Sequence, residues 1–253
     1  MARLEDIELP EGDAAGTLHL NPAAQFHPNV LLPGDPARAM AIATDQLTAP
    51  RMFNHRRGLW GYSGETEAGT GFTIQASGMG GPSAAIVVEE LCDLGAEVIV
   101  RVGTCGALDP EVRLGDLVVV TSAVSDDGAS RALGAEDEIE GDAELRGWLI
   151  AEAGLTSRRV HAGKVATVDL FYDPAADDRH RALVARGAVA LEMEAAAVFA
   201  VAARRGVRAA CLLGVTDELY PEDSRARLDH DAIGELGRDL GAVAVASVSA
   251  ARN

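Results

Sequence analysis

The sequence has little positive charge and few aromatic side chains. Its 253 residues include 22 lysines and arginines against 39 aspartates and glutamates, a formal net charge of −17, and aromatic residues make up 4% of the chain. A protein that neutralises a nucleic-acid backbone needs a basic surface, and one that binds single strands adds aromatic stacking platforms. The composition therefore argues against nucleic-acid binding, and it leaves room for a small anion only in a local pocket where a few arginines converge.

Disulfide-like cysteine spacing and long hydrophobic runs are also missing. The three cysteines, Cys92, Cys105 and Cys211, each lie in an apolar stretch, which favours buried thiols over disulfides or a metal site. No segment approaches the roughly 20 apolar residues that span a bilayer, and the acidic N-terminus lacks the apolar stretch of a secretory signal. We therefore expect a cytoplasmic protein with no membrane partner, in which residues 1–18 form a flexible N-terminal extension.

Hydrophobic residues make up 48% of the chain, which is enough for a well-buried core. Apolar runs that are typical of strands alternate with patterns typical of helices. This alternation predicts one α/β domain over residues 1–253, with a mixed sheet flanked by helices. We expect residues 126–140, which are acidic and irregular, to form an exposed loop. The predicted strands cover 30–32, 72–76, 98–102, 116–122, 160–167, 188–191 and 209–215, and the predicted helices cover 37–47, 82–94, 193–205 and 229–250.

Two arginines near predicted strand ends indicate an oxyanion site. Such a ligand needs close backbone amides and forked guanidinium donors, and Gly34 followed by Arg38 one helical turn later supplies both. Arg101 ends an otherwise apolar strand, where a buried cation must meet an anion or a carboxylate. Thr104 can add a hydroxyl to the same anion. The alternative for Arg101 is a structural salt bridge with an internal acid, and the alternative for Thr104 is an ordinary turn residue.

Three carboxylates follow two other predicted strands. Glu192 and Glu194 are two residues apart, so in extended chain both point to the same face and suit the vicinal hydroxyls of a ribose. Acids near a helix start can instead complement the helix dipole. Asp217 ends an apolar strand, where partial desolvation favours the proton-donating form of a general acid. A helix cap is the alternative for Asp217.

A glycine-rich turn at residues 78–83 follows a predicted strand and opens a predicted helix. It is similar to a dinucleotide-binding turn, but Ser83 stands at the final glycine position and Pro82 intrudes. We therefore favour a packing role for these glycines over a nicotinamide or flavin site.

Taken together, the segments resemble the nucleoside phosphorylase-I family, and within it the hexameric bacterial purine nucleoside phosphorylases. The resemblance runs from about His19 to Asp217, and each segment is a weak signal that gains weight from the shared order and spacing. It implies a phosphorylase/hydrolase-like fold with a distorted, barrel-like central sheet. The segments that carry it are 32–36 (LPGDP), 57–61 (RGLWG), 78–80 (GMG), 101–106 (RVGTCG), 169–172 (DLFY), 192–195 (EMEA) and 216–217 (TD).

The resemblance also implies roles for individual residues and a purine (deoxy)ribonucleoside plus phosphate as substrates, with no metal or organic cofactor. Asp217 would be the catalytic acid at the purine N7. Because two contacts come from a neighbouring subunit, a homo-oligomer is implied, at least a dimer and by family precedent a hexamer of three dimers. The implied phosphate ligands are Gly34, Arg38, Arg101, Thr104 and the neighbour's Arg57, the ribose ligands are Glu192, Met193, Glu194 and the neighbour's His19, and the base contacts are Val168, Phe171, Leu191, Thr216 and Asp217.

The sequence departs from the family pattern at three places. Thr104 and Thr216 stand where the purine enzymes more usually have serine, although the hydroxyl is kept. Those enzymes also have a downstream arginine that moves towards the catalytic aspartate, and here Arg225 and Arg227 are both candidates in a differently spaced segment. An aspartate at 217 can serve a 6-amino or a 6-oxo purine by changing its protonation state, so the preferred base stays open.

Other functions compete with this interpretation. Uridine phosphorylase shares the fold and phosphate site, but its glutamine and arginine after the aromatic segment are missing from residues 171–177. A hydrolase that uses water would leave the predicted arginine cluster without an obvious anion. A non-catalytic nucleotide- or sugar-phosphate-binding module is the alternative from a different class.

Overall fold

The structure is a computed structural model that describes residues 17–219 and 225–251, so the predicted extension 1–18 lies outside the described residues except for its last two positions. The helices are α1 (Pro36–Gln46), α2 (Gly81–Asp93), α3 (Gly128–Ala132), α4 (Ala143–Ala153), α5 (Ala176–Ala185), α6 (Ala195–Arg205) and α7 (His230–Ala250), with a 3₁₀ turn at Arg56–Gly58. The strands are β1 (Asn29–Pro33), β2 (Thr48–Asn54), β3 (Gly61–Glu65), β4 (Gly71–Gln75), β5 (Val98–Ala107), β6 (Leu117–Asp126), β7 (Glu138–Glu140), β8 (Val160–Val168), β9 (Ala188–Glu192), β10 (Arg208–Glu218) and β11 (Ala226–Arg227).

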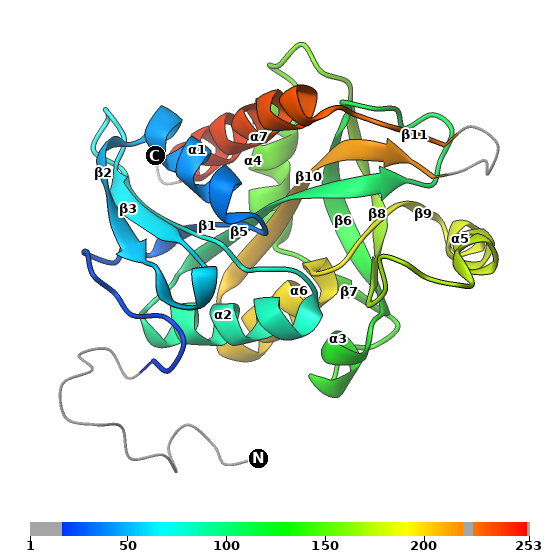
Figure 1. The fold of residues 1–253 in the computed structure, drawn as a ribbon, viewed down its shortest axis with the longest axis horizontal. Helices are drawn as coiled ribbons and strands as arrows, with labels where there is room; N and C mark the ends of the chain where they lie inside the picture. Colours follow the sequence, from blue (N-terminus) through cyan, green and yellow to red (C-terminus); the bar gives the residue numbers. More distant parts are fainter. Residues whose placement is uncertain (1–16, 220–224, 252–253) are drawn as a thin grey trace.

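One mixed sheet joins these strands and partly closes on itself (Figure 1). Its order is β11-β10-β6-β8-β9-β5-β1-β4-β3-β2, with β7 paired to β6. Strand β10 also pairs with β5, so β5, β10, β6, β8 and β9 form a closed ring. Both parallel pairs, such as β1 with β5, and antiparallel pairs, such as β5 with β9, occur. The α/β fold with a mixed, barrel-like sheet is confirmed.

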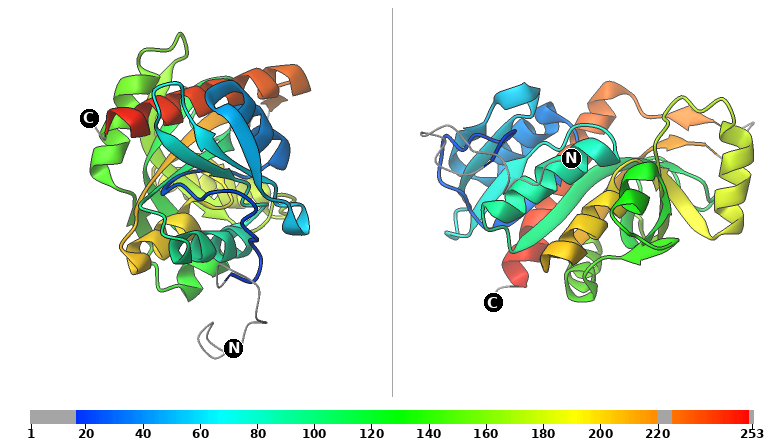
Figure 2. Two further views of the ribbon diagram at one scale, coloured as in Figure 1. Left: turned by 90° about the vertical axis from the view of Figure 1, so that its left-hand side faces the viewer. Right: turned by 90° about the horizontal axis from the view of Figure 1, so that it is seen from below.

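Helices cover both faces of the sheet and create two large apolar clusters (Figures 1 and 2). Helices α2 and α6 pack together on one face, and α1, α4 and α7 pack on the other. Helix α6 is rich in alanine, and nearly all of its residues from Ala195 to Ala202 are fully buried between sheet and neighbours. Small side chains let this helix lie close to the strands that carry the polar residues of the site.

Strand β5 differs from its prediction, because it does not end at the glycines but continues to Ala107. It lies between β1 and β10, and hydrogen bonds on both sides outweigh the low strand propensity of glycine. The glycines have a packing reason. A Cβ at Gly103 would lie 2.7 Å from Nη2 of Arg101, so the glycine leaves room for that side chain to fold back along the strand.

The prediction that residues 126–140 form an irregular loop is wrong, although residues 131–140 are mostly exposed, as predicted. This segment contains α3 and β7, and the carboxylate of Asp127 caps α3 by accepting from the backbone N–H of Ser130 at 2.8 Å. Asp127 and Ser130 are both buried. One acidic residue of the segment, Asp127, thus serves helix capping, which composition alone does not separate from a solvated loop. Sequence patterns also missed β2, β3, α4 and α5. Across residues 17–219 and 225–251, no helix combines the length and apolarity that crossing a membrane requires.

Candidate active site

A cavity of about 650 Å³ opens where β1, β8, β9 and β10 end and where the second half of β5 passes. Ligands of open α/β sheets collect at the carboxyl ends of strands, and this cavity follows that rule. It brings together most of the residues predicted from sequence, which come from six separate segments. Its walls include Gly34, Arg38, Arg101, Thr104, Val168, Phe171, Leu191, Glu192, Met193, Glu194, Thr216, Asp217, Arg225 and Arg227.

One end of the cavity suits an anion. It lies at the N-terminus of α1, where Asp35 caps the helix and Gly34 lines the wall. Burial lowers the pKa of the nearby Arg38 guanidinium. Within the described residues, Nη1 of Arg38 donates one long hydrogen bond of 3.5 Å to the carbonyl of Val102. No carboxylate of the described residues forms an ion pair with Arg38. A partly buried cation that forms no ion pair favours binding of an anion.

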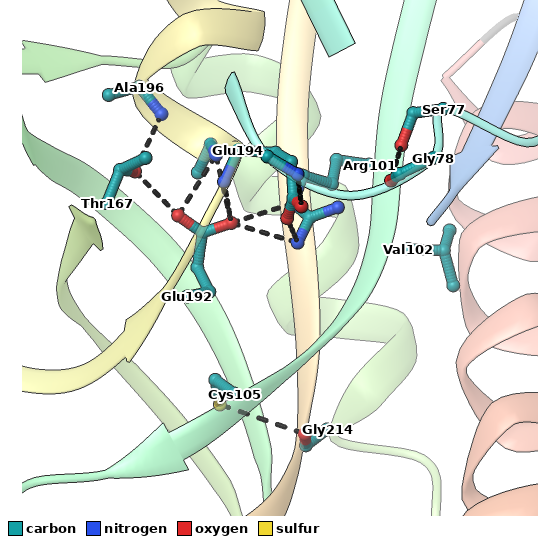
Figure 3. A network of polar contacts seen from close by, with 12 residues as sticks. Ser77, Gly78, Arg101, Val102, Cys105, Thr167, Glu192, Glu194, Ala196 and Gly214 are labelled. Carbon is teal, nitrogen blue, oxygen red and sulfur yellow. Dashed lines mark hydrogen bonds and ion pairs between the residues drawn. The ribbon is translucent and has the colours of Figure 1, made fainter. Parts of the chain in front are cut away.

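Arg101 lies beside this end and is ion-paired with two carboxylates (Figure 3). Its Nη2 is 2.9 Å from Oε2 of Glu192 and 2.5 Å from Oε2 of Glu194, and its Nε donates to Glu192 at 2.9 Å. Burial alone lowers the pKa of Arg101, but Glu194 and Glu192 more than offset it, so the pKa stands above its ordinary value. The internal salt bridge considered from sequence is present, and the same arginine lines the cavity.

The carboxylate of Glu192 accepts several hydrogen bonds and orients the residues that donate them. Its carboxylate accepts from the hydroxyl of Thr167 at 2.6 Å and from the backbone N–H groups of Glu194 and Ala195. It therefore caps α6, which begins at Ala195 rather than at the predicted Met193. Because these donors and Arg101 occupy both of its oxygens, Glu192 is suited to positioning its neighbours.

The glycine-rich turn at 78–83 contacts a carboxylate of its own chain. The N–H of Gly80, whose φ is 85°, donates to Oε1 of Glu194 at 2.5 Å. A left-handed φ is costly for residues other than glycine, so this position explains one glycine of the motif. The turn thus fixes Glu194 at the cavity wall, and its backbone is engaged in that contact.

The opposite end of the cavity carries Asp217. Oδ1 of Asp217 is 2.7 Å from Nη1 of Arg227, and Oδ2 accepts from the hydroxyl of Thr216 at 2.8 Å. The antiparallel pairing of β10 with β11 places Asp217 opposite Arg227. Of the two candidate arginines, Arg227 therefore contacts the aspartate, whereas Arg225 is ion-paired with Asp177 of α5.

Apolar side chains complete this end. Val168 is buried at the end of β8, and Leu191 lines the wall from β9. Phe171 is 63% exposed and packs edge-on against Tyr172 with ring centroids 5.0 Å apart. An exposed ring that lines a cavity offers a flat surface on which an aromatic ligand can stack.

His19 and Arg57 do not line this cavity. Nδ1 of His19 is 2.6 Å from Oε1 of the buried Glu90, which also accepts from the backbone N–H groups of residues 18–20. Arg57 lies in the exposed 3₁₀ turn between β2 and β3 with a φ of 58°. Their contribution to a neighbouring subunit's site stays a prediction.

The sequence profile of the phosphorylase superfamily matches residues 28–250. The chain belongs to this superfamily. A DeoD-type purine nucleoside phosphorylase from Proteus mirabilis is 36% identical over 207 residues, which cover 80% of this chain and 86% of the relative. A guanosine phosphorylase from Halorubrum lacusprofundi is 34% identical and covers 94% of this chain and 93% of its own length. The solved structure of a uridine phosphorylase from Vibrio fischeri aligns with a TM-score of 0.81 at 27% identity, over 89% of this chain and 93% of the other.

In this member of the phosphorylase superfamily, the sequence did not predict the cavity residues that come from α5 and from the segment just before it. Arg179 and His180 line the wall, and Arg179 is ion-paired with Asp173 and Asp126. The sequence signal for α5 is weak, because only two of its residues are buried. Among the residues that the structure covers, no group of three or more His, Cys, Asp and Glu side chains is arranged to hold a metal ion.

Proposed function

We propose that the protein is a purine nucleoside phosphorylase, which reversibly converts a purine (deoxy)ribonucleoside and phosphate into free base and (deoxy)ribose 1-phosphate. One observation carries the proposal. The partly buried Arg38, which forms no ion pair with a carboxylate among the described residues, lies in the same cavity as Glu194 and Asp217. This arrangement supports an anion site beside Arg38, a sugar site at Glu194 and a base site at Asp217, which is the order that the proposed reaction needs. Purine nucleoside phosphorylases and a guanosine phosphorylase among the relatives support the same reaction.

The proposed chemistry is a displacement at C1′. Phosphate, held by Gly34, Arg38, Arg101 and Thr104, attacks C1′ from the face opposite the base. The C1′–N9 bond breaks and its electron pair passes to the purine, while the sugar acquires oxocarbenium character that the phosphate dianion and Glu194 stabilise. In this proposal Asp217 enters the step as the carboxylic acid and delivers its proton to N7 so that the base leaves neutral, a contribution of about 10²–10⁴ in rate, and the carboxylate that remains pairs with Arg227.

The remaining site residues have supporting roles in this proposal. Glu192 holds Arg101 and Glu194, and Met193 lies against the ribose. Val168, Phe171, Leu191 and Thr216 surround the base. Inorganic phosphate is a co-substrate, and the proposed reaction uses no metal or organic cofactor.

The proposal includes a homo-oligomer in the cytoplasm. His19 and Arg57 lie away from this chain's own cavity, so we propose that they complete the ribose and phosphate sites of a neighbouring subunit. That exchange requires at least a dimer, and we propose a hexamer of three dimers. Sedimentation analysis tests this, because a monomeric protein with full activity contradicts it.

Phosphate-dependent turnover is the direct test of the function. Purified protein is incubated with inosine, guanosine, adenosine or uridine, with and without phosphate, and the released base is measured. We expect purine release only with phosphate. Equal release without phosphate indicates a hydrolase, and no release from any nucleoside indicates a binding module. Asp217→Asn is expected to lose turnover by about 10²–10⁴ and to keep phosphate binding.

A uridine phosphorylase is a weaker explanation of the site. Arg179 is the arginine of α5 that reaches the cavity, and both Asp173 and Asp126 engage its guanidinium. Its Nε and Nη1 are therefore directed to carboxylates rather than to a pyrimidine carbonyl in this arrangement. Uridine turnover above that of the purine nucleosides would reverse this ranking.

A further inference from the structure

The base end of the cavity presents a paired donor and acceptor. Asp217 already accepts from Arg227 through one oxygen and from Thr216 through the other. Arg227 is held by backbone pairing, because β11 lies antiparallel to β10 and the N–H of Leu228 donates to the carbonyl of Thr216 at 2.9 Å. Backbone pairing and the contact with Asp217 thus place the guanidinium next to the carboxylate at one wall of the cavity.

Arg227 keeps donors for a ligand. Within the described part of the chain its contact with Asp217 uses one N–H of Nη1, and a guanidinium has five N–H donors and no acceptor. Its side chain is 58% exposed, and it lines the cavity. A group that faces this arginine must therefore be a hydrogen-bond acceptor, since a donor would find only Asp217 beside it among the described residues, and both oxygens of Asp217 already accept a hydrogen bond.

We propose that Arg227 makes the site selective for 6-oxopurine nucleosides over 6-aminopurine nucleosides. The inference rests on the proposed function, in which Asp217 faces N7. The atom next to N7 on that edge is O6 in hypoxanthine and guanine and N6 in adenine. O6 is an acceptor, whereas the N6 amino group is a donor. Arg227 donates to O6. An adenine N6 amino group in the same place would face the guanidinium with a second donor, and no hydrogen bond would form between them.

The same contact favours the transition state. As the C1′–N9 bond breaks, the electron pair enters the purine ring and part of the charge resides on O6. A guanidinium at O6 therefore binds the departing 6-oxopurine more strongly than the intact nucleoside. No proton leaves Arg227, so its role is to bind charge, and proton delivery to N7 remains with Asp217.

The test compares inosine with adenosine, because the two differ at position 6 and the adjoining N1. At saturating phosphate, wild-type kcat/KM for inosine is expected to exceed that for adenosine by about tenfold or more. In Arg227→Gln the side-chain amide can donate or accept, so this ratio is expected to fall to near one. Arg113→Gln is the matched control. Arg113 is 54% exposed and pairs with Glu218, beside Asp217, but does not line the cavity. Its ratio is expected to equal that of the wild type.

A second measurement separates the two proposals. Calorimetry with free hypoxanthine and free adenine reports base preference without requiring turnover, and wild type is expected to bind hypoxanthine at least tenfold more tightly. If no nucleoside is turned over but hypoxanthine still binds more tightly than adenine, the proposed function is contradicted and the role of Arg227 is not. Turnover with adenosine equal to or above inosine, or an unchanged ratio in Arg227→Gln, overturns the role of Arg227.

Discussion

Replacing Arg101 by methionine removes the cation between two buried carboxylates. In the native protein its guanidinium is 4% exposed and lies 2.9 Å from Glu192 and 2.5 Å from Glu194. The variant keeps both acids in the same buried place without their counter-charge. Breaking a buried ion pair from one side costs about 3–5 kcal/mol, because the remaining charge loses its partner after it has lost its water. We expect a loss of unfolding free energy of this size at pH 7.5.

The loss is expected to depend on pH with a defined sign. Burial raises the pKa of Glu192 and Arg101 opposes that rise, so the pKa rises further in the variant. A group whose folded pKa exceeds its unfolded value adds stability below the unfolded pKa and loses it as pH rises through the folded pKa. Arg101→Met should therefore be less destabilised relative to wild type at pH 5 than at pH 7.5.

Urea unfolding at one fixed protein concentration, followed by tryptophan fluorescence, measures this effect at both pH values. Arg101→Met/Glu192→Gln is expected to recover part of the loss, since one of the two stranded charges is gone. Arg205→Met is the control, because Arg205 is 32% exposed where it pairs with Glu89 and should cost about 1 kcal/mol or less. The reasoning is refuted if Arg101→Met lowers the unfolding free energy by less than about 1 kcal/mol at pH 7.5 and the loss is the same at pH 5.

Three further perturbations test other parts of the site and its support. Arg38→Met is expected to raise the KM for phosphate by about 10–100-fold with a smaller change in the KM for nucleoside, because a charge-assisted contact is lost; equal changes in both contradict an anion role. Glu90→Ala leaves the N–H groups of residues 18–20 without their buried acceptor and should lower the unfolding free energy by about 1–3 kcal/mol in urea titrations, whereas an unchanged midpoint argues against this anchor. Burial raises the pKa of Cys92 to about 11, so the folded protein should react slowly with a thiol reagent at pH 8 and fast in urea; rapid labelling of the folded protein speaks against it.

The sequence was a better guide to which residues line the cavity than to which residues they contact. Gly34, Arg38, Glu194 and Asp217 were recognisable because they follow apolar strands, and strand ends meet at one edge of an α/β sheet. The short helix and strand in the acidic segment 126–140 were missed, because capping and solvation require the same residue types. Helix α5 was missed, since little of its surface is buried and its apolar pattern is correspondingly weak.

Local patterns by themselves determined the alternation of strands and helices, and with it the fold class and the positions of the polar strand ends. They did so because periodicity and β-branched or glycine content act over a few residues. The tertiary structure alone decided that Arg227 rather than Arg225 meets Asp217, and that Arg101 lies between Glu192 and Glu194. These pairs depend on the register of strands far apart in sequence, on the closure of the ring and on room left by Gly103, and no local pattern encodes such distances.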